Sequence, residues 1–292
     1  MSFTTRDISL TFTLGTGNFG ESGSNSVTVS GLQVRALIVK AGLTSSPQCE
    51  VAIYGLTLSM MNQLSTLGTP QPIAIQRNNT LTVEVKEEDS QLATVFSGTI
   101  LAAFTDLSSA PDAPFNVYAV TGLIDQLKPI PPTSYAGTVS VATILSSLAA
   151  KMNVGFQNNG VTAVLSNPYL PGTARQQVLR VVNAAGIEWN GMDGGTLAIW
   201  PRGSARNDTV TLISADTGMV GYPTYSDMGP LVTVLHNPGI AFGSKVKIES
   251  IITPACGLWW VGSMTHRLES QTPDGAWFTD LVCTRLNLSS GL

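Results

Sequence analysis

The sequence predicts a mainly β protein with a small α+β module, and three observations support this fold class. Short segments of alternating apolar and polar residues fill the first 130 positions and return after Asp208. This period of two is typical of strands with one buried face. Between the two β-rich blocks, apolar residues recur at helical spacing, and the proline-rich segment 128–132 marks the change. Many short strands with few helices favour closed or strongly curved barrels.

The first block, residues 1–113, is expected to form one β-barrel domain with one short helix. A helix is predicted over 59–67, because Met60, Leu64 and Leu67 lie at positions i, i+4 and i+7. The strands of this block are predicted at 8–14, 27–39 with a break at Gly31, 49–54, 72–76, 80–86 and 94–103.

Residues 131–204 predict the α+β module, which has two helices and a β-hairpin. Apolar side chains follow a helical spacing over 141–152. Thr173 and Gln176 form a capping box, in which the hydroxyl and the amide satisfy N–H groups at the start of a second helix. A hairpin is predicted over 187–200, around a glycine-rich turn.

Residues 114–130 and 205–292 are expected to form a second β-barrel domain, into which the module is inserted. Turn residues such as Asn, Pro, Asp and Gly separate the predicted strands of the second segment. These strands are expected at 209–213, 231–235, 245–251, 258–264 and 277–285, and one more is expected at 115–121.

The composition excludes several functional classes. Charged residues make up 12% of the 292 positions, about half of what is usual in soluble proteins. With 15 Lys and Arg against 19 Asp and Glu, the chain has no basic surplus for nucleic-acid recognition. No stretch offers the roughly 20 apolar residues of a membrane span. A surface so poor in charge is expected to be covered by partners.

No constellation of residues predicts a catalytic, cofactor or metal site. The segment 15–20 matches the dinucleotide-binding spacing G-x-G-x-x-G, but no helical period follows it to aim N–H groups at a phosphate. His236 and His266 are the two histidines, and each ends a predicted strand in isolation. The three cysteines are expected to be buried free thiols: Cys49, Cys256 and Cys283.

The densest charge cluster is the acidic run of Glu84, Glu87, Glu88 and Asp89. Paired carboxylates can cleave glycosides when separate environments split their pKa values. Consecutive carboxylates next to Ser90 more simply predict a solvated turn between two strands.

Contacts with neighbouring molecules are expected at the loops 15–26 and 105–114 and at one pair of tryptophans. The adjacent tryptophans lie in a predicted strand, so their side chains point to opposite faces. One is expected in the core, and the other can pack in the core or contact a neighbouring subunit or partner. The candidate contact residues are Asn18, Phe19, Asp106, Trp259 and Trp260.

Several strings, taken in order, resemble the baseplate hub proteins of contractile-tailed bacteriophages. The segment 51–56 with its following helix is similar to the first domain of that family. The other strings lie at 172–179, 185–189, 195–203, 212–223, 237–248 and 261–268. Their order carries the resemblance, which runs over most of the chain and is clearer after the first 113 residues.

The resemblance implies a structural virion protein rather than an enzyme. A homotrimer would carry two tube-like β-barrel domains per chain in a pseudo-sixfold ring, and would adapt the sixfold tail tube to the threefold central spike. The bore of the ring would pass tape-measure protein and DNA. The implied partners are two further copies of the chain, the tail tube protein, the central spike protein, baseplate wedge proteins and the tape-measure protein. The resemblance places the protein in the tail baseplate of the virion, assembled in the host bacterial cytoplasm.

Three alternatives remain open at this point. Another ring-forming tail component, such as a distal tail or tube-initiator protein, would share the barrel but show sixfold symmetry. A carbohydrate-binding or carbohydrate-cleaving tail protein would need a groove lined with aromatic side chains and paired carboxylates. A β-rich adhesin domain would keep its outer surface free.

Overall fold

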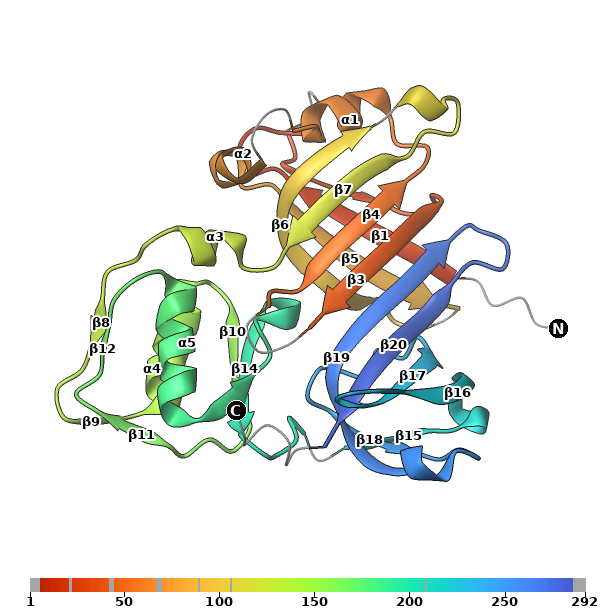
Figure 1. The fold of residues 1–292 in the computed structure, drawn as a ribbon. Coiled ribbons are helices and arrows are strands. Elements are labelled where there is room, and N and C mark those ends of the chain that lie inside the picture. Colours follow the sequence, from red (N-terminus) through yellow and green to blue (C-terminus); the bar gives the residue numbers. More distant parts are fainter. Residues whose placement is uncertain are drawn as a thin grey trace. The chain divides into compact units, whose positions relative to one another are not determined.

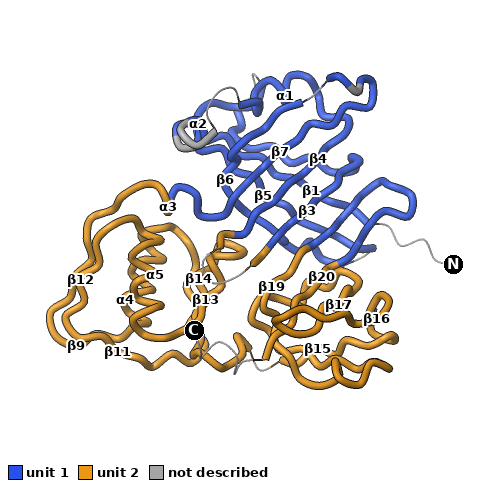
Figure 2. Tube along the Cα trace, in the orientation of Figure 1, with its two compact units in different colours: residues 1–39, 47–124, 266–278 blue, residues 40–46, 125–265, 279–292 orange. Residues whose placement is uncertain are grey.

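Strands dominate the computed structural model of the chain, in agreement with the alternating sequence pattern (Figure 1). The structure describes residues 6–20, 23–41, 45–66, 70–88, 90–105, 107–207 and 209–285. The chain divides into two units (Figure 2). Unit 1 comprises Met1–Val39, Pro47–Ile124 and His266–Phe278, and unit 2 comprises Lys40–Ser46, Asp125–Thr265 and Thr279–Leu292.

Unit 1 is built on antiparallel strands in the order β3-β4-β7-β6-β5-β1-β2. The strands are β1 (Arg6–Thr13), β2 (Ser26–Val29), β3 (Val34–Lys40), β4 (Gln48–Ile53), β5 (Thr80–Glu87), β6 (Ala93–Thr105) and β7 (Phe115–Val120). Alternate side chains of these strands form the core, which includes the fully buried Phe12, Phe96 and Phe115. Burying one face of each strand follows directly from the period of two in the sequence.

Two helices in unit 1 lie beside β6: α1 (Leu58–Leu64) and α2 (Pro70–Arg77). The helix predicted over 59–67 is confirmed as far as Leu64, where α1 ends, and Leu67 lies outside the described residues. The Thr57 side chain accepts a hydrogen bond from the Met60 N–H at the start of α1. The strand predicted at 72–76 is wrong, because α2 occupies this segment. Pro70 is the first residue of α2, where a helix needs no N–H donor and where the fixed φ of proline fits.

Strand β7 pairs with β4 and β6, so residues 115–120 belong to the sheet of unit 1. The sequence pattern had suggested that 114–130 would join the later strands. Phe115 lies opposite Thr105 across the antiparallel pair of β6 and β7, which a short connection joins. Strands that follow each other along the chain commonly pair in this way. The short helix α3 (Leu123–Leu127) comes next.

The α+β module of unit 2 contains α4 (Val141–Lys151) and α5 (Ala174–Ala185), both predicted from the sequence. The capping box is confirmed, because the Gln176 N–H donates to Thr173 Oγ1 at 3.3 Å and the Thr173 N–H donates to Gln176 Oε1 at 3.0 Å. A small sheet in the order β10-β14-β13 includes the predicted hairpin. The module strands are β8 (Thr133–Ser134), β9 (Thr138–Ser140), β10 (Gly155–Asn158), β11 (Val164–Ser166), β12 (Tyr169–Leu170), β13 (Ile187–Trp189) and β14 (Thr196–Pro201).

The remaining strands follow the order β16-β17-β20-β19, with β18 beside β19 and β15 beside β18. They are β15 (Val210–Ile213), β16 (Met219–Ser226), β17 (Gly229–Leu235), β18 (Lys245–Ile248), β19 (Gly257–Ser270) and β20 (Trp277–Thr284). The segment 266–278, which ends β19 and begins β20, is part of unit 1. Short 3₁₀ turns lie at Leu107–Ser109, Asp193–Gly195, Ala215–Thr217 and Thr253–Ala255.

Strand β16 was not predicted as a strand, because its sequence breaks the alternating pattern. Gly221 and Pro223 lie within it, and its register with β17 shifts between Val220 and Thr224. Proline is tolerated in a strand mainly at a sheet edge, where its missing N–H is not needed. Strand β16 is such an edge, since it ends the strand order.

Candidate assembly surfaces

Both histidines lie in the interior of the described part of the chain. His236 is buried, its Nδ1 lies 3.2 Å from Thr279 Oγ1, and burial together with the Lys40 charge lowers its pKa to about 4. His266 is also buried. Among the described residues, no group of three or more His, Cys, Asp or Glu side chains lies close enough together to hold a metal ion. No helix among them is both long and apolar enough to cross a membrane.

The three cysteines are free thiols, as expected. Cys49 and Cys283 are buried, and burial raises the pKa of the Cys283 thiol to about 12. Cys256 is half-buried rather than buried, which corrects the prediction for this residue. Its Sγ accepts from the Ser250 N–H at 3.3 Å and donates to the Ser250 carbonyl at 3.1 Å.

The glycine-containing segment 15–20 is a loop after β1, and β2 rather than a helix follows it. Phe19 forms a bridge with Ser24 and packs half-buried against the core of unit 1. Asn18 is exposed and lines a pocket of about 220 Å³ with Arg77 and Asn79. The loop therefore uses Phe19 as an anchor and presents Asn18. Asp106, the third loop candidate, lies outside the described residues.

The two adjacent tryptophans of β19 have different environments, as their alternation predicts. Trp259 is buried in the core of unit 2, and its Nε1 donates to the Ala255 carbonyl at 2.8 Å. Trp260 is half-buried. Its Nε1 is buried and has no hydrogen-bond partner among the described residues.

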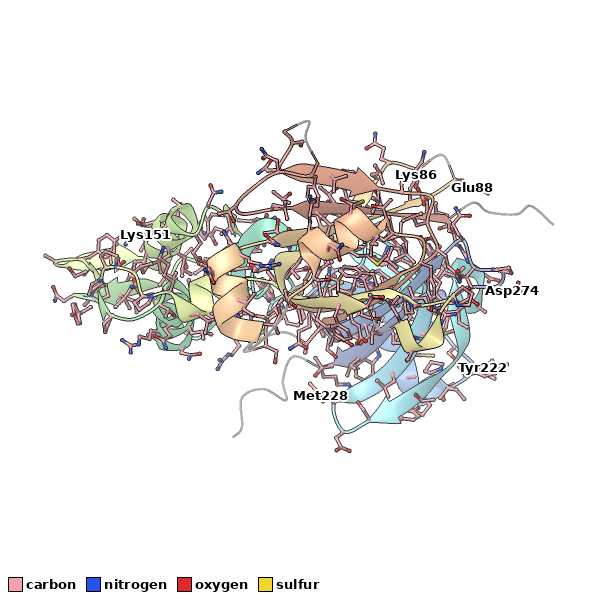
Figure 3. The ribbon with its side chains drawn as sticks, turned by 90° about the horizontal axis from the view of Figure 1, so that it is seen from above. Lys86, Glu88, Lys151, Tyr222, Met228 and Asp274 are labelled. Atoms are coloured by element: carbon pink, nitrogen blue, oxygen red, sulfur yellow. The ribbon has the colours of Figure 1, made fainter. Side chains whose placement is uncertain are left out.

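Edge strand β16 carries large apolar side chains in contact with solvent. Tyr222 is 65% exposed, Tyr225 57% and the nearby Met228 53%. Figure 3 shows Tyr222 and Met228 at the periphery of the molecule. The segment 209–235 holds only two charged residues, Asp216 and Asp227. Soluble proteins usually protect an edge strand with lysines or other charges, and this edge has none of its own.

A second edge strand in unit 2 has the same character. Val210 and Leu212 are both exposed on β15, which among the described strands pairs with β18 alone. Leu212 lies opposite Lys247 of β18, and Lys247 lies opposite Leu258 of β19, which is exposed as well. Apolar residues gathered in this way mark a surface that associates with other molecules.

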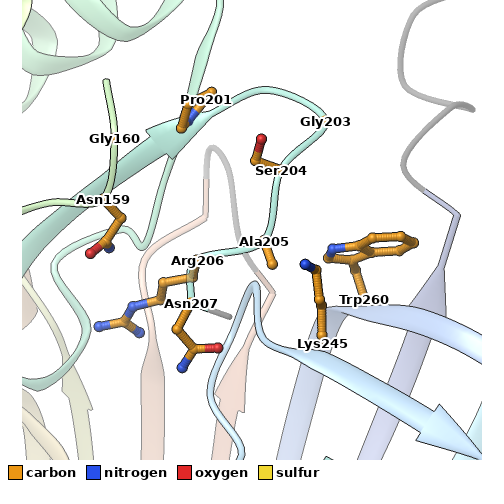
Figure 4. Close-up of a pocket in the computed structure, with 10 residues that line it drawn as sticks. All are labelled: Asn159, Gly160, Pro201, Gly203, Ser204, Ala205, Arg206, Asn207, Lys245 and Trp260. Atoms are coloured by element: carbon orange, nitrogen blue, oxygen red, sulfur yellow. The ribbon is translucent and has the colours of Figure 1, made fainter. Parts of the chain in front are cut away.

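A pocket of about 620 Å³ lies within unit 2 (Figure 4). Its charged lining residues are Arg206 and Lys245, and Trp260 forms one wall. Asn159 also lines it, and the Nδ2 of this residue is a buried donor without a partner in the described structure. The full lining is Asn159, Gly160, Pro201, Gly203, Ser204, Ala205, Arg206, Asn207, Lys245 and Trp260, and none of these ten residues carries a carboxylate. The charged side chains of this lining are therefore all cationic.

Most of the pocket lining comes from the segment 201–207, and the fold brings Asn159, Lys245 and Trp260 to it from distant parts of the sequence. Trp260 was the single lining residue among the sequence candidates. The uncovered strand β16 was also missed, although the near absence of charge over 209–235 was a usable signal.

Of the acidic run, Glu84 and Glu87 lie in β5, and Glu88 lies in the predicted turn that follows this strand. Glu87 pairs with Arg6 at 3.2 Å, and its N–H donates to Ser90 Oγ at 3.0 Å. Glu88 is exposed at the tip with a left-handed φ of 48°. Asp89 lies outside the described residues. The turn presents carboxylates to solvent and does not enclose them.

The fold is that of phage tail proteins. A prophage MuSo2 43 kDa tail protein from Shewanella oneidensis matches with a TM-score of 0.59 and 11% identity, over 95% of this chain and 97% of its own. A tail protein from Neisseria meningitidis matches with a TM-score of 0.60 and 12% identity, over 94% and 96% of the two chains. The E. coli c3393 protein, a component of the type VI secretion system, matches with a TM-score of 0.57 and 10% identity, over 96% and 78%.

The chain belongs to the baseplate hub gp41 family, which it matches over residues 8–279. It is therefore a structural protein of the phage tail baseplate and a component of the virion. No curated protein matches the sequence.

Proposed function

We propose that the protein is a homotrimeric hub that adapts a sixfold tail tube to a threefold central spike. Each chain contributes two tube-like β domains, so three chains make a pseudo-sixfold ring. The tail tube protein binds one side of the ring and the spike protein the other, while baseplate wedge proteins bind outside. The bore passes the tape-measure protein and then DNA. The role needs no catalysis.

The observation that carries this proposal is the apolar edge strand β16. An uncovered edge with Tyr222, Tyr225 and Met228 in solvent is an aggregation hazard in a free monomer. A closed ring covers the edges of every subunit, because each copy meets a neighbour on both sides. The exposed edge therefore supports a ring of identical chains.

The division of the strands between the two units supports the pseudo-sixfold arrangement. Unit 1 holds β1 to β7, and unit 2 holds β15 to β18 with parts of β19 and β20. Each unit has its own buried apolar core among these strands. Two such β-rich units per chain supply the six similar positions that a sixfold tube requires from three chains.

The charge balance supports passage of DNA without retention. The net charge of −4 and the 12% of charged residues leave no basic excess to hold phosphates. Lysines and arginines on the wall of a bore would bind DNA by displacing its counterions.

Light scattering of the purified chain, coupled to size-exclusion chromatography, tests the proposal. The expected mass is three times the 30.7 kDa of one chain. A hexamer would favour the alternative of a distal tail or tube-initiator ring. A monomer at every concentration up to the solubility limit would contradict a self-assembling hub.

A further inference from the structure

We propose that the pocket lined by Arg206 and Trp260 receives the acidic turn around Glu88 of a neighbouring copy of this chain. The inference rests on the proposed trimer, because it names a contact between the copies. It concerns a site on unit 2 and a turn on unit 1, which would meet across two different molecules.

The first argument is the symmetry that a trimer imposes. A cyclic trimer has heterologous contacts, in which each copy presents two different and complementary surfaces. The chain must therefore carry both a receptor and its ligand. Among its described surfaces, the donor-rich pocket and the carboxylate-rich turn form a pair of opposite character.

The second argument is the unmet hydrogen bonding in the pocket. Asn159 Nδ2 and Trp260 Nε1 are both buried donors without a partner in the described structure, and both side chains line the pocket. Native proteins rarely leave a buried donor without an acceptor, because the group has lost its hydrogen bonds to water. An acidic side chain that enters the pocket brings the kind of acceptor oxygen that these two donors lack.

Among the described residues, positive charge outweighs negative charge around Arg206. Asp193 pairs with Lys40 at 3.0 Å and also acts on Arg206, so two cations share one carboxylate. Burial lowers the pKa of Arg206, and the Asp193 charge opposes this shift. An entering anion would stabilise the partly buried guanidinium. Figure 4 shows Arg206 on the same side of the pocket as Asn159, with Lys245 beside Trp260.

The turn has the chemistry and the shape to act as the ligand. Residues 84–89 contain four carboxylates and one lysine, the highest density of acid in the chain. The β5–β6 hairpin carries Glu88 outward, and Figure 3 shows this residue at the periphery. Glu88 has no ion pair among the described side chains, whereas Glu87 is held by Arg6. Glu88 is thus the exposed carboxylate of this turn that can pair with a cation of another molecule.

Cross-linking between two different variants tests the contact directly. Chains carrying Glu88→Cys are mixed with chains carrying Ser204→Cys, a pocket residue that is exposed, and treated with a short bismaleimide. We expect a cross-linked dimer that forms only in the mixture. The control replaces Glu88→Cys with Asp274→Cys, because Asp274 is also an exposed acidic residue in a left-handed turn of unit 1 with φ 52°. Wild-type chains give the background from the native thiols.

Charge reversal adds an energetic test. Glu88→Arg and Arg206→Glu are each expected to raise the concentration at which trimers form by at least about tenfold, and the double variant is expected to restore it. Glu88 is exposed, so its substitution leaves the monomer folded even where Arg206→Glu proves unstable. Arg202→Glu is the control, because Arg202 lies outside the pocket and pairs with Glu188 at 3.5 Å.

The outcomes separate the contact from the trimer. The inference is overturned if the wild type is trimeric but shows no specific cross-link, and if Glu88→Arg has no effect on assembly. In that case the proposed trimer is still supported. A specific cross-link in a chain that does not form trimers supports the contact and removes the proposed assembly. Pocket variants that self-associate normally but fail to enter virions would assign the pocket to another tail protein, and would also overturn the inference.

Discussion

The Lys40 ammonium lies 3.0 Å from the Asp193 carboxylate, and the two side chains are only 10% and 11% exposed. The pair joins the end of β3 to the turn between β13 and β14, two segments of unit 2 that are far apart in the sequence. Asp193 begins the short turn Asp193–Gly195 within the hairpin predicted over 187–200. The structure gives it a second role as the partner of a nearly buried lysine.

Removing one member of this pair leaves an uncompensated charge. We expect Lys40→Met to lower the free energy of unfolding by about 2–3 kcal/mol, slightly below the range for a fully buried pair. Urea denaturation measures this difference. Lys247→Met is the control, because the Lys247–Glu249 pair at 2.7 Å is solvent-exposed, and its midpoint should stay unchanged. Equal midpoints for the two variants would contradict the structural role of Lys40.

The stability of unit 2 should depend on pH through His236. Its folded-state pKa of about 4 lies below the value of about 6.5 expected in the unfolded chain. The unfolded state therefore binds more protons between these values, and stability is lost as the pH falls from 6.5 towards 4. The full difference amounts to about 3 kcal/mol.

NMR titration of the His236 ring checks this prediction. A midpoint near 4 is expected for the wild type, and Lys40→Met should raise it because the positive charge near the ring is removed. A midpoint at the unperturbed value in the folded protein would show that the ring is not desolvated.

Two glycines with the same backbone conformation should differ in their tolerance of a methyl group. Gly243 and Gly203 both have φ 81°, but a Cβ at Gly243 would lie 2.6 Å from Cζ2 of Trp200, whereas a Cβ at Gly203 meets nothing within 4 Å. Gly203→Ala should cost about 1 kcal/mol, the strain of a left-handed residue. Gly243→Ala should cost a further 1–3 kcal/mol or so, because it overpacks the core around Trp200. Thermal unfolding of both variants gives the comparison, and equal losses would rule out the clash.

The exposed tyrosine of β16 should matter for assembly and not for monomer stability. Tyr222→Lys introduces a charge at the edge and is expected to reduce self-association strongly, since an edge lysine opposes strand addition. Tyr169→Lys is the matched control, because Tyr169 on β12 is 66% exposed and lies in the α+β module. Light scattering measures the oligomer, and circular dichroism checks that both melting temperatures stay close to the wild type. Equal oligomerisation of the two variants would show that the β16 edge is not an interface.

Local signals in the sequence predicted the elements that depend on local contacts. Helix α5 begins at the capping box of Thr173 and Gln176 and is capped by Gly186 at its end. The hydrogen bonds of both caps join residues within one helical turn, so a short stretch of sequence is enough to predict them. The alternating strands of unit 1 followed from the burial of one face. Helix α2 was mispredicted as a strand because its short segment contains two isoleucines, which are common in strands. Pro70 is the local signal for a helix start in this segment.

Strand pairings and pockets that join distant segments could not be predicted from short stretches of sequence. The place of β7 between β4 and β6 depends on which strand edges are free in the folded sheet. The pocket is lined by Asn159, Arg206 and Trp260 from three separate segments, and no sequence spacing predicts that these residues lie together. The different environments of Trp259 and Trp260 could be predicted locally, because adjacent residues of a strand point to opposite faces. Trp259 lies in the core and Trp260 is half-buried.

We propose that three copies of this chain form the hub of the tail baseplate. Electron microscopy of the intact virion, with the tail tip averaged without imposed symmetry, tests it most directly. We predict a ring with a threefold axis in which six β domains surround an open bore, two from each chain. A ring with true sixfold symmetry, or a single copy of the chain at the periphery of the tail tip, would contradict it.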